Sequence, residues 1–82
     1  MPRIPRDISG QTLCKCLGKY GYIKTRQIGS HMRLTSHHMG KEHSITIPDH
    51  NPIKIGTLNK IISDVADYLQ LEKSVLISDI KD

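Results

Sequence analysis

The amino-acid sequence predicts an α+β domain in which one helix precedes three antiparallel strands and a second helix follows them. Apolar residues recur at helical spacing between residues 9 and 20, and again between residues 56 and 69. Polar and apolar residues alternate between residues 22 and 47, and glycine-containing stretches interrupt this alternation. We expect both helices to cover one face of the sheet and to leave the other face open.

The first helix is predicted to follow Ser9, whose hydroxyl can cap it, and to end near residue 19, with Gly21 as its stop. Its buried stripe is expected to be Leu13, Cys16, Leu17 and Tyr20. The second helix is expected to begin at Gly56 or Thr57, with an apolar face of Leu58, Ile61, Ile62, Val65, Ala66 and Leu69. A break near residue 70 stays open, and a short extra helix could then use Leu71, Val75, Leu76 and Ile80.

Three strands are predicted over residues 22–28, 31–36 and 43–47, and Pro48 ends the third. Gly29 and Ser30 form a tight turn between the first two strands, and residues 37–42 form the second hairpin loop. The buried strand residues are expected to be Met32, Leu34, Ile45 and Ile47. Strict alternation then places a basic cluster on the open face of the sheet, made of Lys24, Arg26, His31 and Arg33.

The chain has 82 residues, which is enough for one domain, so residues 1–82 are assigned to a single domain with 71–82 as a C-terminal extension. Residues 1–46 hold eight Lys or Arg against two Asp or Glu, a formal charge of +6. Residues 47–82 hold four against six, a charge of −2. The positive half should attract a polyanion such as nucleic acid, although a solvated basic surface explains the charge equally well.

Cysteine usage and hydropathy indicate the compartment. Cys14 and Cys16 lie two residues apart on the predicted helix, so they point to different sides and cannot easily form a disulfide. Two isolated thiols without a signal peptide indicate a reducing cytosol. No apolar run reaches membrane-spanning length, so we expect a cytoplasmic protein with no membrane contact.

His31 is the most informative candidate for chemistry. It follows two small residues, Gly29 and Ser30, and lies between Arg26 and Arg33. A glycine lets a phosphate backbone approach, turn amides can donate to phosphate oxygens, and arginines stabilise the charge that develops on phosphate. An imidazole can take a proton from a ribose 2′-hydroxyl or give one to the leaving 5′-oxygen. By spacing alone, however, a surface histidine without a function is the more common case.

One histidine does not obviously supply both proton transfers, so Ser30, Lys24 or water is left as the source of the second. The remaining histidines are His37, His38, His43 and His50. Together with the two cysteines, they form neither the C-x-x-C nor the H-E-x-x-H pattern of a metal site. We therefore expect neither a bound metal nor a cofactor. His50 follows the last strand and could help to bind RNA, although a solvated loop histidine is the more common case.

Several motifs in order resemble one bacterial family. They are the opening Arg3-Ile4-Pro5-Arg6-Asp7-Ile8-Ser9-Gly10, the turn Lys19-Tyr20-Gly21-Tyr22, the central Arg26-Gln27-Ile28-Gly29-Ser30-His31-Met32-Arg33-Leu34, the strand end Ile47-Pro48-Asp49-His50, and Gly56-Thr57-Leu58 with Ile61. Their order and spacing over residues 3–69 resemble HicA-type toxins, the mRNA interferases of HicA–HicB toxin–antitoxin systems.

The resemblance implies a fold like that of a double-stranded-RNA-binding domain and a ribonuclease whose catalytic histidine corresponds to His31. It implies that Gly29 and Ser30 form the turn that presents this histidine. It also implies two partners, which are mRNA and a HicB-like antitoxin that covers the active face.

Two alternatives to a metal-independent RNA endonuclease stay open. A non-catalytic RNA-binding module of the same fold would bind RNA in a salt-sensitive way without forming product. The start of the second helix, Gly56-Thr57-Leu58-Asn59-Lys60, is poor in lysine for the phosphate clamp of such modules. A protein-interaction domain would bind its partner independently of Lys24, Arg26 and Arg33.

Overall fold

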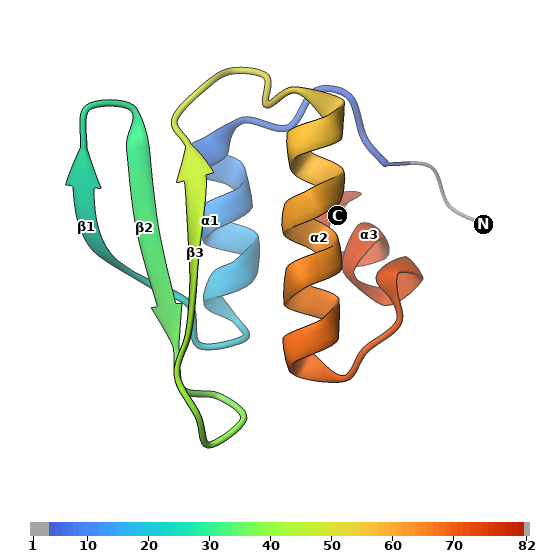
Figure 1. Ribbon diagram of the computed structural model, residues 1–82. Coiled ribbons are helices and arrows are strands. Elements are labelled where there is room, and N and C mark those ends of the chain that lie inside the picture. Colours follow the sequence, from blue (N-terminus) through green and yellow to red (C-terminus); the bar gives the residue numbers. More distant parts are fainter. Residues whose placement is uncertain (1–3, 82) are drawn as a thin grey trace.

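The computed structural model describes residues 4–81. Its elements, in chain order, are α1 (Gly10–Gly18), β1 (Ile23–Ile28), β2 (His31–Ser36), β3 (His43–Pro48), α2 (Ile55–Leu69) and α3 (Lys73–Lys81). The strands form one antiparallel sheet in the order β1-β2-β3, α1 and α2 pack against it, and α3 packs against α1 and α2 (Figure 1). The predicted α+β fold is therefore confirmed, and the short extra helix exists as α3.

Helix α1 begins as predicted, because the Ser9 hydroxyl accepts a hydrogen bond from the backbone N–H of Thr12 at 3.1 Å. Leu13 and Leu17 are buried in the core. Cys16 and Tyr20, which we expected in the same buried stripe, are only half-buried. The physical reason for Tyr20 is that α1 ends at Gly18, so this side chain follows the helix and reaches α3 through its hydroxyl.

The alternation predicted for β2 and β3 is confirmed. Met32, Leu34, Ile45 and Ile47 are buried under the helices, whereas His31, Arg33 and Thr46 are exposed on the other face. One face of the sheet is therefore covered and the other is open. β3 continues one residue beyond the predicted end, because Pro48 still pairs with His31.

Helix α2 begins at Ile55, one residue before the predicted start, and buries every residue of its predicted apolar face together with Tyr68. Gln70 ends the helix in a left-handed conformation, with φ of 59°. In α3, Leu76, Ile77 and Ile80 are buried. Val75, one of the four residues suggested for this helix, is 44% exposed, because Ile77 rather than Val75 lies on the side of α3 that faces the core.

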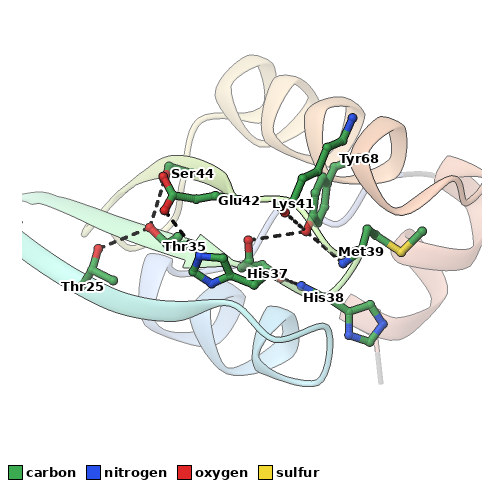
Figure 2. Close-up of polar contacts among 10 residues, drawn as sticks. Thr25, Thr35, His37, His38, Met39, Lys41, Glu42, Ser44 and Tyr68 are labelled. Carbon is green, nitrogen blue, oxygen red and sulfur yellow. Dashed lines mark hydrogen bonds and ion pairs between the residues drawn. The ribbon is translucent and has the colours of Figure 1, made fainter.

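The β2–β3 loop lies at the end of the sheet opposite the β1–β2 turn (Figure 1). The hydroxyl of Tyr68 holds this loop to α2. The Tyr68 hydroxyl accepts the backbone N–H of Met39 at 3.0 Å and donates to the carbonyl of Lys41 at 2.5 Å (Figure 2). The Tyr68 ring also stacks on His43, with ring centroids 4.6 Å apart. These contacts explain why a histidine-rich loop packs in an ordered way against the end of α2.

The link between α1 and α3 depends on Asp79. Its carboxylate accepts a hydrogen bond from the Tyr20 hydroxyl and lies 3.0 Å from Nζ of Lys19. The hydrogen bond from Tyr20, followed by the one from Lys19, holds the pKa of Asp79 below its ordinary value of 3.8. Burial, and then the hydrogen bond to Asp79, raise the pKa of Tyr20 to about 12.

We expect Tyr20→Phe to lower the free energy of unfolding by about 1 kcal/mol at pH 7, because the carboxylate loses a hydrogen bond. A carboxyl group with a lowered pKa in the folded state stabilises the fold above its ordinary pKa and loses this effect as the pH falls below about 4. Urea denaturation measures the free energy of unfolding at each pH. The difference in this free energy between wild type and Tyr20→Phe should be smaller at pH 3 than at pH 7. An equal difference at both pH values would contradict this role of Asp79.

Candidate functional site

The β1–β2 turn consists of Gly29 and Ser30, between the paired residues Ile28 and His31. Gly29 has φ of +57°, as a glycine at the first central position of a type II′ hairpin turn does. A Cβ built on Gly29 would meet no atom within 4 Å, so the space above this glycine is open. The Ser30 carbonyl accepts the N–H of Asp49 at 2.7 Å, and this bond ties the turn to the end of β3. The turn is thus fixed in place while its outer surface stays free for a ligand.

His31 is the first residue of the central strand, where it pairs with Ile28 on one side and Pro48 on the other. Its backbone is therefore held by both neighbouring strands. Its side chain is exposed on the open face of the sheet. This combination of a fixed backbone and a solvent-accessible imidazole suits a group that transfers protons to and from a bound ligand.

Two arginines face each other beside this histidine. Arg26 on β1 is the direct cross-strand partner of Arg33 on β2, and both are exposed. Like charges directly opposite each other destabilise a strand pair. Within residues 4–81 neither guanidinium forms an ion pair with a carboxylate. The fold therefore carries an electrostatic cost here that a bound anion would relieve.

These side chains line one shallow depression of about 110 Å³, whose walls are Arg26, Ile28, His31, Arg33 and Thr46. Pockets for small organic ligands are several times larger, at roughly 300–1,000 Å³. The depression is therefore suited to one part of a long ligand lying across the sheet. Thr46 enters it from β3, where it is the cross-strand partner of Arg33. The sequence does not mark Thr46 as a site residue, because only strand pairing brings it to this position.

Lys24 does not join this cluster, so the expected meeting of Lys24 with Arg26, His31 and Arg33 is wrong. A bulge between Lys24 and Arg26 shifts the register, and Lys24 pairs with Leu34, a residue of the covered face. Lys24 donates instead to Oε1 of Gln27 at 3.0 Å. Its charge also partly offsets the effect of burial, which raises the pKa of Cys14 on α1.

The bulge leaves Thr25 on the open face with Arg26. The Thr25 hydroxyl donates to the carbonyl of Arg33 at 3.3 Å and lies 3.5 Å from the hydroxyl of Thr35, which continues as a row to Ser44 (Figure 2). Nothing in the sequence of β1 marks this extra residue, since a threonine and an arginine also fit a regular strand. The predicted alternation therefore holds in β2 and β3 but not in β1.

The other histidines lie outside the depression. His37 is in the β2–β3 loop, 3.4 Å from Glu42, and its side chain is 70% exposed. Nδ1 of His43 is hydrogen-bonded to the Tyr22 hydroxyl at 2.7 Å, and the His50 carbonyl accepts the N–H of Gly10. Residues 4–81 bring together no group of three His, Cys, Asp or Glu side chains suited to a metal ion.

In the part of the chain that the structure describes, no helix has the length and apolar character needed to cross a membrane.

Comparison with known families gives one result that covers this site. Residues 10–66 match a family model described as HicA toxin of bacterial toxin–antitoxin systems. The matched segment includes α1, all three strands and most of α2, and it contains the whole depression around His31. No curated protein and no solved structure matched the chain. The match spans more than half of the chain, and the chain therefore belongs to the HicA toxin family.

Proposed function

We propose that this toxin is an mRNA interferase, an RNA endonuclease of the cytoplasm that needs no metal ion and uses His31 as a general acid or base. One observation carries the proposal. Two guanidinium groups face each other without an acidic partner among the described residues, and they share a depression with an exposed imidazole. Membership of a toxin family adds that the chemistry should harm a growing cell, and cleavage of mRNA does so.

The proposed reaction places one phosphodiester of RNA over the depression. Arg26 and Arg33 bind its non-bridging oxygens, and the N–H groups of the Gly29-Ser30 turn can donate to the same phosphate. His31 removes the proton from the ribose 2′-hydroxyl, whose oxygen then attacks phosphorus. The bond from phosphorus to the 5′-oxygen breaks, the leaving oxygen takes up a proton, and a 2′,3′-cyclic phosphate remains. The attacking group belongs to the substrate, so these steps need no metal-bound water.

Among the groups proposed for the second proton transfer, Lys24 has the least support. Lys24 pairs with Leu34, so its side chain leaves the sheet on the face opposite to that of His31, and it donates to Gln27. We therefore favour Ser30, in the turn next to His31, or solvent water for this step. Lys24 is exposed at the sheet edge, where it contributes to RNA binding only as a nearby positive charge.

Membership of a toxin–antitoxin family implies an antitoxin partner. We propose a HicB-like protein that covers the open face of the sheet, because the groups proposed to bind RNA lie there and a cover would exclude RNA.

The alternative is an RNA-binding module without catalysis. The same basic cluster supports this alternative, in which His31 has no catalytic role. Purified protein incubated with mixed single-stranded RNA in EDTA separates the two. Cleavage products ending in 2′,3′-cyclic phosphate support the ribonuclease, whereas RNA binding without product supports the module. If a protein partner binds the wild type and variants of both arginines with equal affinity, the result would instead support a protein-interaction domain.

The arginine pair gives a prediction with opposite signs for binding and for stability. Arg26→Ala or Arg33→Ala should each weaken RNA binding about tenfold, because a charged hydrogen bond to phosphate is lost. Each should also reduce the slope of log affinity against log salt by about 1. The same changes should raise the free energy of unfolding by about 0.5 kcal/mol, since the facing like charges are separated.

Fluorescence anisotropy across a salt series and urea denaturation measure these two effects. Lys41→Ala is the matched control, because Lys41 is an exposed basic residue in the loop at the opposite end of the sheet. A loss of RNA binding as large for Lys41→Ala as for the arginine variants would show general charge attraction and contradict a site at the pair.

A further inference from the structure

Two large apolar side chains lie exposed on the open face of the sheet, and both belong to β1. Ile23 is 69% exposed and Ile28 is 62% exposed. Their cross-strand partners, Thr35 and His31, place both on the same face as Arg26 and Arg33. Only Ile28 lines the depression that holds His31 and the arginine pair. The fold therefore places one apolar side chain within a polar, basic site and leaves a similar one outside it.

We propose that Ile28 is an RNA contact that packs against the nucleobase next to the phosphate bound at Arg26 and Arg33. This inference rests on the proposed function and names a further residue of the same site. Cβ atoms of directly opposed residues lie about 4.5–5.5 Å apart, so Ile28 is adjacent to His31. A base joined to the ribose that reacts at His31 would therefore reach the Ile28 side chain.

The composition of the site makes Ile28 the group that fills this role. Proteins that bind single-stranded nucleic acid commonly stack bases on aromatic rings. This chain has no Trp and no Phe. Its three tyrosines are engaged elsewhere, Tyr22 and Tyr68 in the core and Tyr20 at α3. Ile28 is the only aliphatic residue among the five that line the depression, so it is the side chain there best suited to pack against a base.

Charge and apolar surface together favour RNA as the ligand of this residue. The guanidinium groups on the same surface attract an anion, and the backbone of RNA carries its bases at each phosphate. An aliphatic side chain reads no donor or acceptor pattern on a base edge. The contact should therefore strengthen binding to any base without selecting among the four.

The chain offers a matched pair of variants to test this. Ile28→Ala should lower kcat/KM for RNA cleavage about fivefold, mainly through KM, because partial burial of one aliphatic side chain is lost. Ile23→Ala removes a similarly exposed isoleucine from the same strand and face and should change kcat/KM less than twofold. Ile28→Leu should restore most of the loss. Equal effects of the two alanine variants would overturn the proposal.

A binding experiment separates base contact from a change in hairpin shape. In a His31→Ala background, anisotropy is measured with a single-stranded RNA and with an abasic strand of the same ribose-phosphate backbone. Ile28→Ala should weaken binding of the RNA about fivefold and leave binding of the abasic strand unchanged. An equal loss on both strands would overturn the proposal, as would no loss on either. Failure of the wild type to cleave RNA would reject the ribonuclease alone, because this binding test needs no cleavage.

Discussion

Replacing His31 by alanine is expected to lower the rate of RNA cleavage by about 10²–10⁴-fold, to below detection, because the variant loses its proposed general acid or base. The fold should be unaffected. The His31 side chain is exposed and, within the described residues, forms no hydrogen bond, while the backbone pairing on both sides of the strand stays available to alanine. RNA binding should persist, since Arg26 and Arg33 remain in place. Cleavage of mixed RNA in EDTA, with anisotropy on the same samples, measures both properties.

His37→Ala is the matched control for this experiment. It removes another exposed histidine, from the loop at the opposite end of the sheet, and should leave cleavage unchanged. Growth arrest on expression should follow the same order, present for wild type and His37→Ala and absent for His31→Ala. Cleavage retained by His31→Ala would reject the assigned role of this residue.

Replacing Gly10 by alanine is expected to lower the free energy of unfolding by about 3 kcal/mol, as overpacking of a tightly packed core does. A Cβ on Gly10 would lie 2.2 Å from the carbonyl oxygen of Pro48 and 3.1 Å from Cα of Asp49. Both are backbone atoms, so α1 or the end of β3 has to move. The Gly10 N–H donates to the carbonyl of His50 at 2.9 Å, and this bond would be strained as well. Because Pro48 pairs with His31, the displacement should also reduce cleavage.

Gly18→Ala provides the control in the same helix. No atom lies within 4 Å of the added Cβ, and the backbone of Gly18 is helical, so alanine should raise the free energy of unfolding by about 0.5 kcal/mol. Urea denaturation of both variants gives the comparison. A Gly10→Ala protein as stable as the wild type would show that the contact between α1 and the end of β3 is loose.

The local elements of this protein could be predicted because their signals are local. A serine whose hydroxyl caps the third residue of α1, a Gly-Ser pair that suits a two-residue turn, and strict alternation over β2 each need only a few consecutive residues. The apolar face of α2 is likewise set by helical spacing over four turns. Family membership also followed from motifs in order along the chain, and the family match confirmed it.

The composition of the site could be predicted only in part. The same alternation that placed Arg33 beside His31 failed for Lys24, because one bulged residue in β1 turns every preceding side chain to the opposite face. Thr46 was missed because it is distant in sequence and enters through the β2–β3 pairing. The burial of Ile77 in place of Val75 depends on where α3 begins and on the surface against which it packs.

By itself the sequence determined the order of α1, the three strands and α2, the buried faces of β2, β3 and α2, and the turn before His31, but it left α3 open. Tertiary structure alone decided which charged side chains share the face of that histidine, and that Thr46 completes its surroundings. The physical reason is the range of the interactions. Capping, turn geometry and hydrophobic periodicity act between neighbours in the chain, whereas strand register, bulges and helix docking are settled by contacts between residues far apart in sequence.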